Sequence, residues 1–367
     1  MFRKIIRLTL LLGIFGCGTM FDSTGSSGSR DKITIPKEIS VKIPEILKNS
    51  KNKRVEKIEK ESVEQNISQG YNRLKGNIEE IVWSQKMMEI NLLFIEEVIG
   101  EIDRRCKKTA LDKLCIIESG ELSFAFNDNF FIELSSIVNE EIDDSLYELK
   151  DKIIFLGEVK FTQYSKNENY QYNLKIDTSP LSKLLGDDET SIQILKWSKD
   201  ENRVFSYFSD ESNSQKSDFG INYFKKDSGE KEMFVDSSFT SKVNIDRGKF
   251  HLKIIEKNDK DETFEITSKL ESKEEYEGEI YYDNSSSIGE ISNQGGFLSI
   301  SGNFRGEISK EKYLFDGNGE IISSRYCEES LVCDLNDDST WLDMNTIEFT
   351  QGVKLIGTVG GLKNSTR

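Results

Sequence analysis

The number and spacing of the cysteines in this 367-residue chain suggest disulfide bonds or a metal site. Besides Cys17, the chain contains Cys106, Cys115, Cys327 and Cys333. An even number of cysteines is typical of disulfides when a chain is exported. Four cysteines allow three pairings, and the short loops favour Cys106 with Cys115 and Cys327 with Cys333. A four-thiolate zinc site is the alternative, but zinc pairs are usually spaced C-x₂-C, unlike either pair here.

Histidine occurs once, as His251 in the strand-like segment KFHLKII. A Ser-His-Asp triad would need it, and no serine stands in a G-x-S-x-G pattern. We therefore interpret His251 as a structural or surface residue. The sequence also lacks a phosphate-binding loop and a dinucleotide fingerprint, so no cofactor is predicted. The 65 Asp and Glu residues leave a paired-carboxylate hydrolase open, although so many carboxylates will pair by chance.

Two acidic stretches carry oxygen ligands at spacings that suit calcium. In the first, from Asp316 to Glu320, a hairpin turn explains the pattern better, since Ile321 stands where a calcium loop needs glycine. The second directly follows Cys333 and contains Asp334, Asn336, Asp337 and Asp338. If a disulfide fixes this loop, its oxygen atoms could bind calcium, and these four residues are the candidate calcium ligands.

The chain is acidic, with a formal net charge of −16. Such a charge repels phosphate backbones, so we predict no nucleic-acid binding. It also disfavours docking on anionic lipid headgroups through a basic patch. The 22 Phe and 12 Tyr residues indicate packed structure rather than disorder.

The first residues have the pattern of a secretory signal peptide. Arg3, Lys4 and Arg7 are followed by an apolar run that is too short to cross a bilayer, which takes about 20 residues. The segment Ile14-Phe15-Gly16-Cys17 resembles the lipobox of bacterial lipoproteins. The resemblance implies that residues 1–16 are removed and that Cys17 carries diacylglycerol and an acyl chain such as palmitate. Membrane contact would then occur through the lipid anchor.

The segments after the anchor are expected to hold the folded body away from the bilayer. Residues 17–31 are rich in Gly and Ser and predict a flexible tether. Residues 32–61 predict an extended strap and a charged linker, because Pro36 and Pro44 interrupt any helix. In enteric lipoproteins an Asp after the modified cysteine retains the protein on the inner membrane. Here Gly18 follows Cys17, so we expect the outer membrane of a bacterial envelope, with the body facing either the periplasm or the outside.

Residues 62–150 predict a helical region with one short strand. Apolar residues recur every three, four or seven positions from Val63 to Ile102, as along one stripe of a helix. Packing on a sheet of the same chain is the favoured interpretation, and a coiled-coil seam is the alternative. A strand around Leu122 to Phe126 and a short helix from Phe130 to Val138 follow.

From residue 152 onward, about ten to twelve segments alternate polar and apolar residues between polar turns, as in an antiparallel meander. The predicted fold class is α+β, with a long amphipathic N-terminal helix packed on a large antiparallel β-meander over residues 151–350 and a tail over 351–367. The sheet residues expected to face the helix are Phe161, Tyr172, Ile194, Phe205, Tyr223 and Phe250. This architecture resembles the open half-barrel of the LolA and LolB lipoprotein carriers, which implies an interior that holds acyl chains.

These observations predict a membrane-anchored envelope lipoprotein of non-enzymatic type. It would bind an apolar ligand, such as a lipid or acyl chain, or a protein partner. The alternatives are a carboxylate-based hydrolase of envelope glycans and a structural or assembly subunit. A concave apolar sheet face would favour the carrier, whereas a filled core would favour a protein-binding role.

Overall fold

The computed structural model describes residues 33, 35, 36, 41, 69–126, 128–138, 153–166, 169–180, 189–258, 260–276, 278–304, 307–317, 321–327 and 331–343. Cys17, the predicted signal peptide and tether, most of the predicted strap and linker, the first part of the helical repeat from Val63 and the predicted tail 351–367 lie outside these residues. The chain divides into two compact units. Unit 1 comprises Met1–Ile39 and Ser84–Phe224, and unit 2 comprises Ser40–Trp83 and Lys225–Arg367. The domain boundaries expected from the sequence, at residues 31, 61, 150 and 350, are not tested by this division and stay a prediction.

Unit 1 contains six strands in one antiparallel sheet and a separate two-stranded pairing of β2 with β3. The order in the sheet is β1-β4-β5-β6-β7-β8, so consecutive hairpins build most of it. The helix α3 (Gln69–Cys106) contributes its residues from Ser84 onward to this unit. The other elements are β1 (Cys115–Ile117), β2 (Leu122–Phe124), α4 (Asp128–Val138), β3 (Ile153–Phe155), β4 (Glu158–Gln163), β5 (Tyr172–Asp177), β6 (Thr190–Trp197), β7 (Arg203–Glu211) and β8 (Gln215–Lys225).

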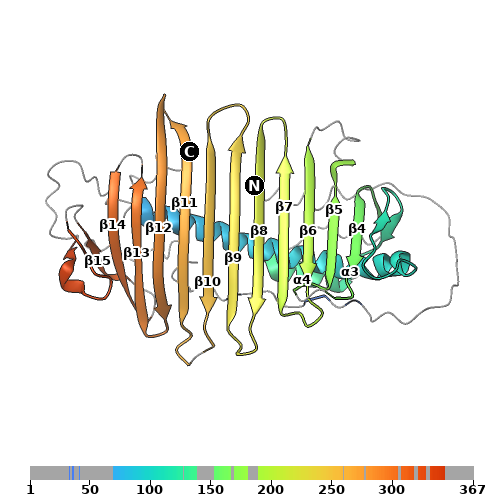
Figure 1. The fold of residues 1–367 in the computed structure, drawn as a ribbon, viewed down its shortest axis with the longest axis horizontal. Coiled ribbons are helices and arrows are strands. Elements are labelled where there is room, and N and C mark those ends of the chain that lie inside the picture. Colours follow the sequence, from blue (N-terminus) through green and yellow to red (C-terminus); the bar gives the residue numbers. More distant parts are fainter. Residues whose placement is uncertain are drawn as a thin grey trace. The chain divides into compact units, whose positions relative to one another are not determined.

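In unit 2, each strand pairs antiparallel with the next one along the chain, as the ribbon in Figure 1 shows. Polar turns connect the strands, because residues such as Asn, Asp and Gly satisfy or relax the backbone at reversals. The elements are β9 (Lys231–Ser241), β10 (Arg247–Glu256), β11 (Phe264–Tyr276), β12 (Glu279–Ser292), β13 (Gly295–Phe304), β14 (Glu307–Asp316), β15 (Ile321–Tyr326), the 3₁₀ turn η3 (Asp338–Thr340) and β16 (Leu342–Asp343). The antiparallel β structure predicted from the alternation is confirmed.

The predicted α+β fold class is wrong. Within the part of the chain that the structure describes, strands predominate, at 54% against 16% for helices, so this part is mostly β. The periodicity indicated one helix, between Val63 and Ile102, and that single pattern was given too much weight beside the many strands. In the described part of residues 62–150, α3 ends at Cys106, and turns and the short strands β1 and β2 follow before α4 begins. The helical repeat is the most conspicuous pattern in the sequence, but it belongs to a single element.

The C-terminal part of α3 lies in the core of unit 1. Leu92, Leu93, Phe94 and Ile95 are four consecutive buried residues, so more than one stripe of the helix is covered. The second covered side faces aromatic residues: the ring of Phe94 meets that of Phe124 edge to face, with centroids 5.3 Å apart. Such pairs add to the burial of apolar area. The periodicity identified the stripe but not this second contact.

Four of the six sheet residues expected to face the helix are buried, namely Phe161, Tyr172, Tyr223 and Phe250. The expectation for Ile194 and Phe205 was wrong, since both are only half-buried. Their neighbours Leu195 and Val204 occupy the core instead. Because successive side chains alternate between faces, a shift of one residue moves a side chain to the opposite face.

Candidate functional site

Both predicted disulfides are confirmed. Cys106 pairs with Cys115 and Cys327 pairs with Cys333, with Cα atoms 5.6 Å and 6.1 Å apart. The first joins the end of α3 to the edge strand β1, in unit 1. The second closes a short loop at the C-terminal side of unit 2, between β15 and β16. Each disulfide therefore fixes a connection between elements that follow each other in the chain.

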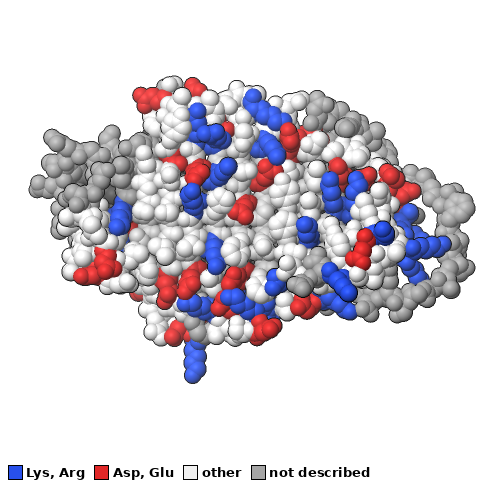
Figure 2. Space-filling model, in the orientation of Figure 1, with Lys and Arg blue, Asp and Glu red and all other residues white. Residues whose placement is uncertain are grey.

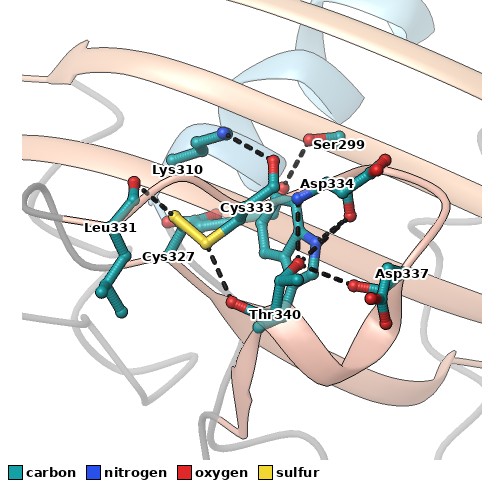
Figure 3. Close-up of a disulfide and its surroundings, with 10 residues drawn as sticks. Ser299, Lys310, Cys327, Leu331, Cys333, Asp334, Asp337 and Thr340 are labelled. Carbon is teal, nitrogen blue, oxygen red and sulfur yellow. Dashed lines mark hydrogen bonds between the residues drawn. A yellow bond between two sulfur atoms is a disulfide. The ribbon is translucent and has the colours of Figure 1, made fainter.

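The Cys327–Cys333 disulfide belongs to a small cap, which we define as residues 327 and 331–343. Figure 3 shows the disulfide with its neighbours. Both cysteines are buried against Trp341, and Leu335 packs beside them. The Trp341 indole Nε1 donates a hydrogen bond to the Asp334 carbonyl oxygen at 2.7 Å. The buried indole thus has its polar atom satisfied, as a well-packed cap requires.

Two lysines of β14 hold this cap. The Lys312 side chain is only 4% exposed, and its ammonium contacts the Asp338 carboxylate at 2.6 Å and the Leu335 carbonyl oxygen. The Lys310 ammonium donates to the Cys333 carbonyl oxygen at 3.3 Å, as Figure 3 shows. A buried cation is tolerated when such partners surround it. The cap therefore covers the sheet face to which Lys310 and Lys312 point.

The four calcium candidates lie in this cap, but their oxygens face different donors. Asp334 Oδ1 accepts the Asn336 N–H at 2.9 Å. Asp337 Oδ1 accepts both the hydroxyl (2.6 Å) and the N–H (3.0 Å) of Ser339, and these bonds hold the pKa of the Asp337 carboxyl below its usual value. Asp338 contacts Lys312. Among the residues that the structure describes, no group of three or more His, Cys, Asp or Glu side chains could hold a metal ion.

The sheet of unit 2 has two faces with different environments. We define the inner face as the one that carries the buried residues Leu252, Ile254 and Ile300. The outer face carries the alternate residues, among them His251, which pairs across the strands with Lys269 of β11. His251 is exposed, and its Nδ1 contacts the Asp236 carboxylate, also exposed. This position agrees with the interpretation of His251 as a surface residue.

Strand β12 reverses the usual distribution of polar and apolar residues. Its buried inner face carries Asp283, Ser285, Ser287 and Gly289, and only Ile291 at the end of the strand is an apolar member of this face. Its outer face is exposed and carries apolar residues: Tyr282 is 58% exposed and Ile288 is 46% exposed. We define the outer surface of β12 by Ile280, Tyr282, Asn284, Ser286, Ile288 and Glu290. The sequence alone did not indicate this surface. Alternation of residues along a strand does not tell which of the two sets faces the core.

Small residues suit the inner face of β12 for a steric reason. Leu74 of α3, Phe250, Ser268, Leu270 and Ser287 line a cavity there that has room for only about 10 Å³. A cavity of this size is at the lower limit of what can hold a single water molecule. The hydroxyls of Ser268 and Ser287 lie 2.6 Å apart and hydrogen-bond to each other. The inner face is thus filled around the Ser268–Ser287 pair, so the reversed pattern does not leave a ligand cavity at this point.

The cap borders the outer surface of β12. Across the strands, Ile288 pairs with Ser299 of β13, and Ser299 pairs with Lys312 of β14. Ser299 and Lys312 are buried under the cap, whereas Ile288 is not. The Thr267 neighbour of Ile288 on β11 is exposed. The outer surface of β12 therefore begins where the cap ends.

A polar hollow lies in unit 1 beside the turn from β6 to β7, lined by Gln171, Ser198, Lys199, Asp200 and Arg203. The Lys199 N–H donates to Gln171 Oε1 at 2.7 Å, and the Arg203 N–H donates to Ser198 Oγ at 3.0 Å. A hydrogen bond from Ser198 lowers the pKa of the Asp200 carboxyl. These bonds stabilise the turn.

None of the described helices combines the length and the apolar character that crossing a bilayer requires. No family model, no curated protein and no solved structure matches this chain.

Proposed function

We propose that this protein is a lipid-anchored envelope lipoprotein that binds a protein partner through the outer surface of β12. The observation that carries the proposal is the reversed pattern of β12, with Tyr282 and Ile288 exposed and serines and a glycine buried. In folded proteins the places that break the usual patterning are most often functional. Exposed apolar side chains that lie together mark interaction surfaces.

The anchor half of the proposal rests on the N-terminal sequence. The basic start, the short apolar run and Ile14-Phe15-Gly16-Cys17 resemble the signal and lipobox of bacterial lipoproteins. Several acyl chains on one cysteine hold a protein firmly, since each buried CH₂ contributes about 0.8 kcal/mol. Gly18 in place of Asp favours the outer membrane as the location.

Filled interiors favour a protein partner over an acyl chain. Ligand pockets for small molecules have volumes of roughly 300–1,000 Å³. The cavity beneath β12 has about 10 Å³. In unit 1, Tyr172, Leu195 and Trp197 fill the corresponding sheet face, and the rings of Tyr172 and Trp197 stack with centroids 5.1 Å apart.

The composition of the surface suits a protein partner with mixed charges. Around the apolar residues of β12, the outer face carries Lys269 and Glu271 on β11, which form an ion pair at 2.5 Å. The Lys273 ammonium lies over the Tyr282 ring, 5.3 Å from its centroid. Apolar residues with an aromatic ring, surrounded by both signs of charge, are typical of interfaces with a polar rim.

The anchor is tested by expressing the protein with labelled palmitate. We expect label on the natural chain and none on the Cys17→Ser variant. Label that persists in Cys17→Ser would contradict the anchor. This experiment does not involve the outer surface of β12, so either half of the proposal can fail alone.

Partner binding is tested by photo-crosslinking in intact cells, with a photoreactive residue at position 286, between Asn284 and Ile288. We expect a discrete protein adduct that disappears when Ile288→Asp is added. The matched control is Val243→Asp, because Val243 is also an exposed aliphatic residue but lies in the turn between β9 and β10. Absence of any adduct, or an adduct that survives Ile288→Asp, would exclude this surface.

A further inference from the structure

The loop 107–114, which the Cys106–Cys115 disulfide closes, differs in charge from the rest of the protein. The chain as a whole carries a formal charge of −16. Between Asp103 and Leu114, however, five residues are basic (Arg104, Arg105, Lys107, Lys108 and Lys113) and only Asp103 and Asp112 are acidic. Figure 2 shows Lys and Arg side chains gathered at this end of unit 1. A strongly acidic protein therefore has a basic loop among its described residues.

The lysines of this loop are available to an outside partner. Lys107, Lys108 and Lys113 are exposed, and none of the three forms an ion pair with a carboxylate that the structure describes. The arginines differ, because Arg104 and Arg105 both contact the Glu101 carboxylate, at 2.5 Å and 2.8 Å. The three ammonium groups are thus exposed to an external anion, although Asp112 partly offsets the charge of Lys113.

Exposed aliphatic side chains lie among these lysines. Leu111 is 43% exposed, Leu114 is 53% exposed, and Ile116, which follows the disulfide on β1, is 47% exposed. Three large aliphatic side chains within six residues of an exposed loop and edge strand exceed what scattered surface residues give.

Hydrogen bonds fix the backbone of the loop. The Thr109 N–H donates to the Cys106 carbonyl at 2.8 Å, and the Asp112 N–H donates to the Gln163 carbonyl at 2.9 Å. The Asp112 carboxylate accepts the Ser165 N–H at 2.9 Å and the Ser165 hydroxyl, which ties the loop to the residues after β4. Asp112 keeps its negative charge in these bonds and attracts Lys113 of the same loop, so the basic excess of the loop rests mainly on Lys107 and Lys108. The leucines stay exposed in a loop that cannot collapse over them.

We propose that the loop 107–114 together with Ile116 binds the surface of an anionic phospholipid membrane. Aliphatic side chains enter the boundary between headgroups and acyl chains, while lysines bind lipid phosphates, each contributing about 1 kcal/mol near an anionic surface. Residues 107–116 contain no aromatic residue, the type that is enriched in protein interfaces, so the lysines with aliphatic neighbours favour a lipid surface over an acidic protein. The proposal is independent of Cys17 acylation. It also revises the expectation that the lipid anchor alone contacts the membrane, which treated the negative charge as uniform.

The test measures binding of the full chain carrying Cys17→Ser to vesicles, so that no covalent lipid contributes. The vesicles contain phosphatidylcholine alone, or phosphatidylcholine with about one third phosphatidylglycerol, at about 0.1 M salt. We expect binding to the anionic vesicles, and a loss of at least about tenfold in affinity when Lys107, Lys108 and Lys113 are all changed to Glu. Leu111→Asn with Leu114→Asn should also weaken binding, with less dependence on salt.

The matched control changes three other exposed lysines, Lys225, Lys249 and Lys260, to Glu and therefore has the same net charge. It should bind within about twofold of the unaltered protein, since distant charges are screened. Equal losses in the two triple variants would overturn the proposal. A second result would also overturn it: no protein binds vesicles, and sedimentation shows that only the loop variant loses self-association. The loop would then bind a second copy of this acidic chain.

Discussion

Strands β5 and β12 show opposite relations between residue type and burial. In β5, the apolar residues Tyr172, Leu174 and Ile176 are buried and their polar neighbours are half-exposed. In β12, serines and a glycine are buried, and Tyr282 and Ile288 are exposed. Burial alternates from residue to residue along β5 and from Tyr282 to Ile291 of β12, and each strand pairs antiparallel with a strand on either side. The comparison teaches that alternation identifies a strand, whereas the neighbours of the strand decide which of its faces is the core.

The largest effect is expected in β5. Leu174→Ala removes a fully buried side chain and should lower the free energy of unfolding by about 3 kcal/mol, from lost burial and the remaining cavity. The adjacent Lys175→Ala, on the other face, should change it by less than about 0.5 kcal/mol. Urea unfolding followed by circular dichroism measures both. Similar values for the two variants would show that β5 is not buried on one face.

Two adjacent serines of β12 offer the same substitution on opposite faces. Ser287→Leu forces a large side chain into the filled inner face and should cost about 2 kcal/mol of unfolding free energy. Ser286→Leu, on the outer surface of β12, should cost less than about 0.5 kcal/mol. Thermal unfolding distinguishes the two variants. If Ser286→Leu proves the more damaging, the faces of β12 have been assigned the wrong way round.

A smaller effect concerns the hydrogen bond between Ser268 and Ser287. Removing one partner, as in Ser287→Ala, should cost about 1 kcal/mol, because it leaves the other hydroxyl without its bond. The double variant Ser268→Ala with Ser287→Ala should cost less than the two single variants together. Chemical unfolding of all four proteins gives the coupling. Additive losses would mean that the hydroxyls act separately.

The smallest effect on stability is expected at Ile288. Ile288→Ala removes an exposed side chain and should change the unfolding free energy by less than about 0.5 kcal/mol. The same change should weaken the crosslinked adduct formed from position 286. A stability loss as large as that of Leu174→Ala would place Ile288 in a core and remove the reason for calling this strand a docking surface.

The sequence predicted the features that depend on short spacings. Both disulfides follow from their close cysteines, and the antiparallel strands follow from alternation and turn residues. It failed where distant elements decide the outcome. Ile194 and Phe205 face away from the core because of strand register, and Phe94 is buried because Phe124 and Phe126 reach the second side of α3.

The outer surface of β12 was hidden for the same reason. Read alone, Ile280, Tyr282 and Ile288 resemble the core face of a strand, and Ser285, Ser287 and Gly289 resemble the solvent face. That interpretation is reversed by the burial of Ser285 and Ser287, which line one cavity together with Leu74 and Phe250. The calcium candidates Asp334 and Asp337 likewise have backbone N–H partners that spacing alone does not reveal.

Hydroxyl-radical footprinting of tyrosines tests the docking surface most directly. In the purified protein, Tyr282 should react quickly, whereas the buried Tyr172 and Tyr313 should stay unmodified. In intact cells, the account predicts that Tyr282 becomes protected while the buried tyrosines remain as they were. Reaction of Tyr282 at the same rate in cells as in the purified protein would contradict the claim that a partner covers the outer surface of β12.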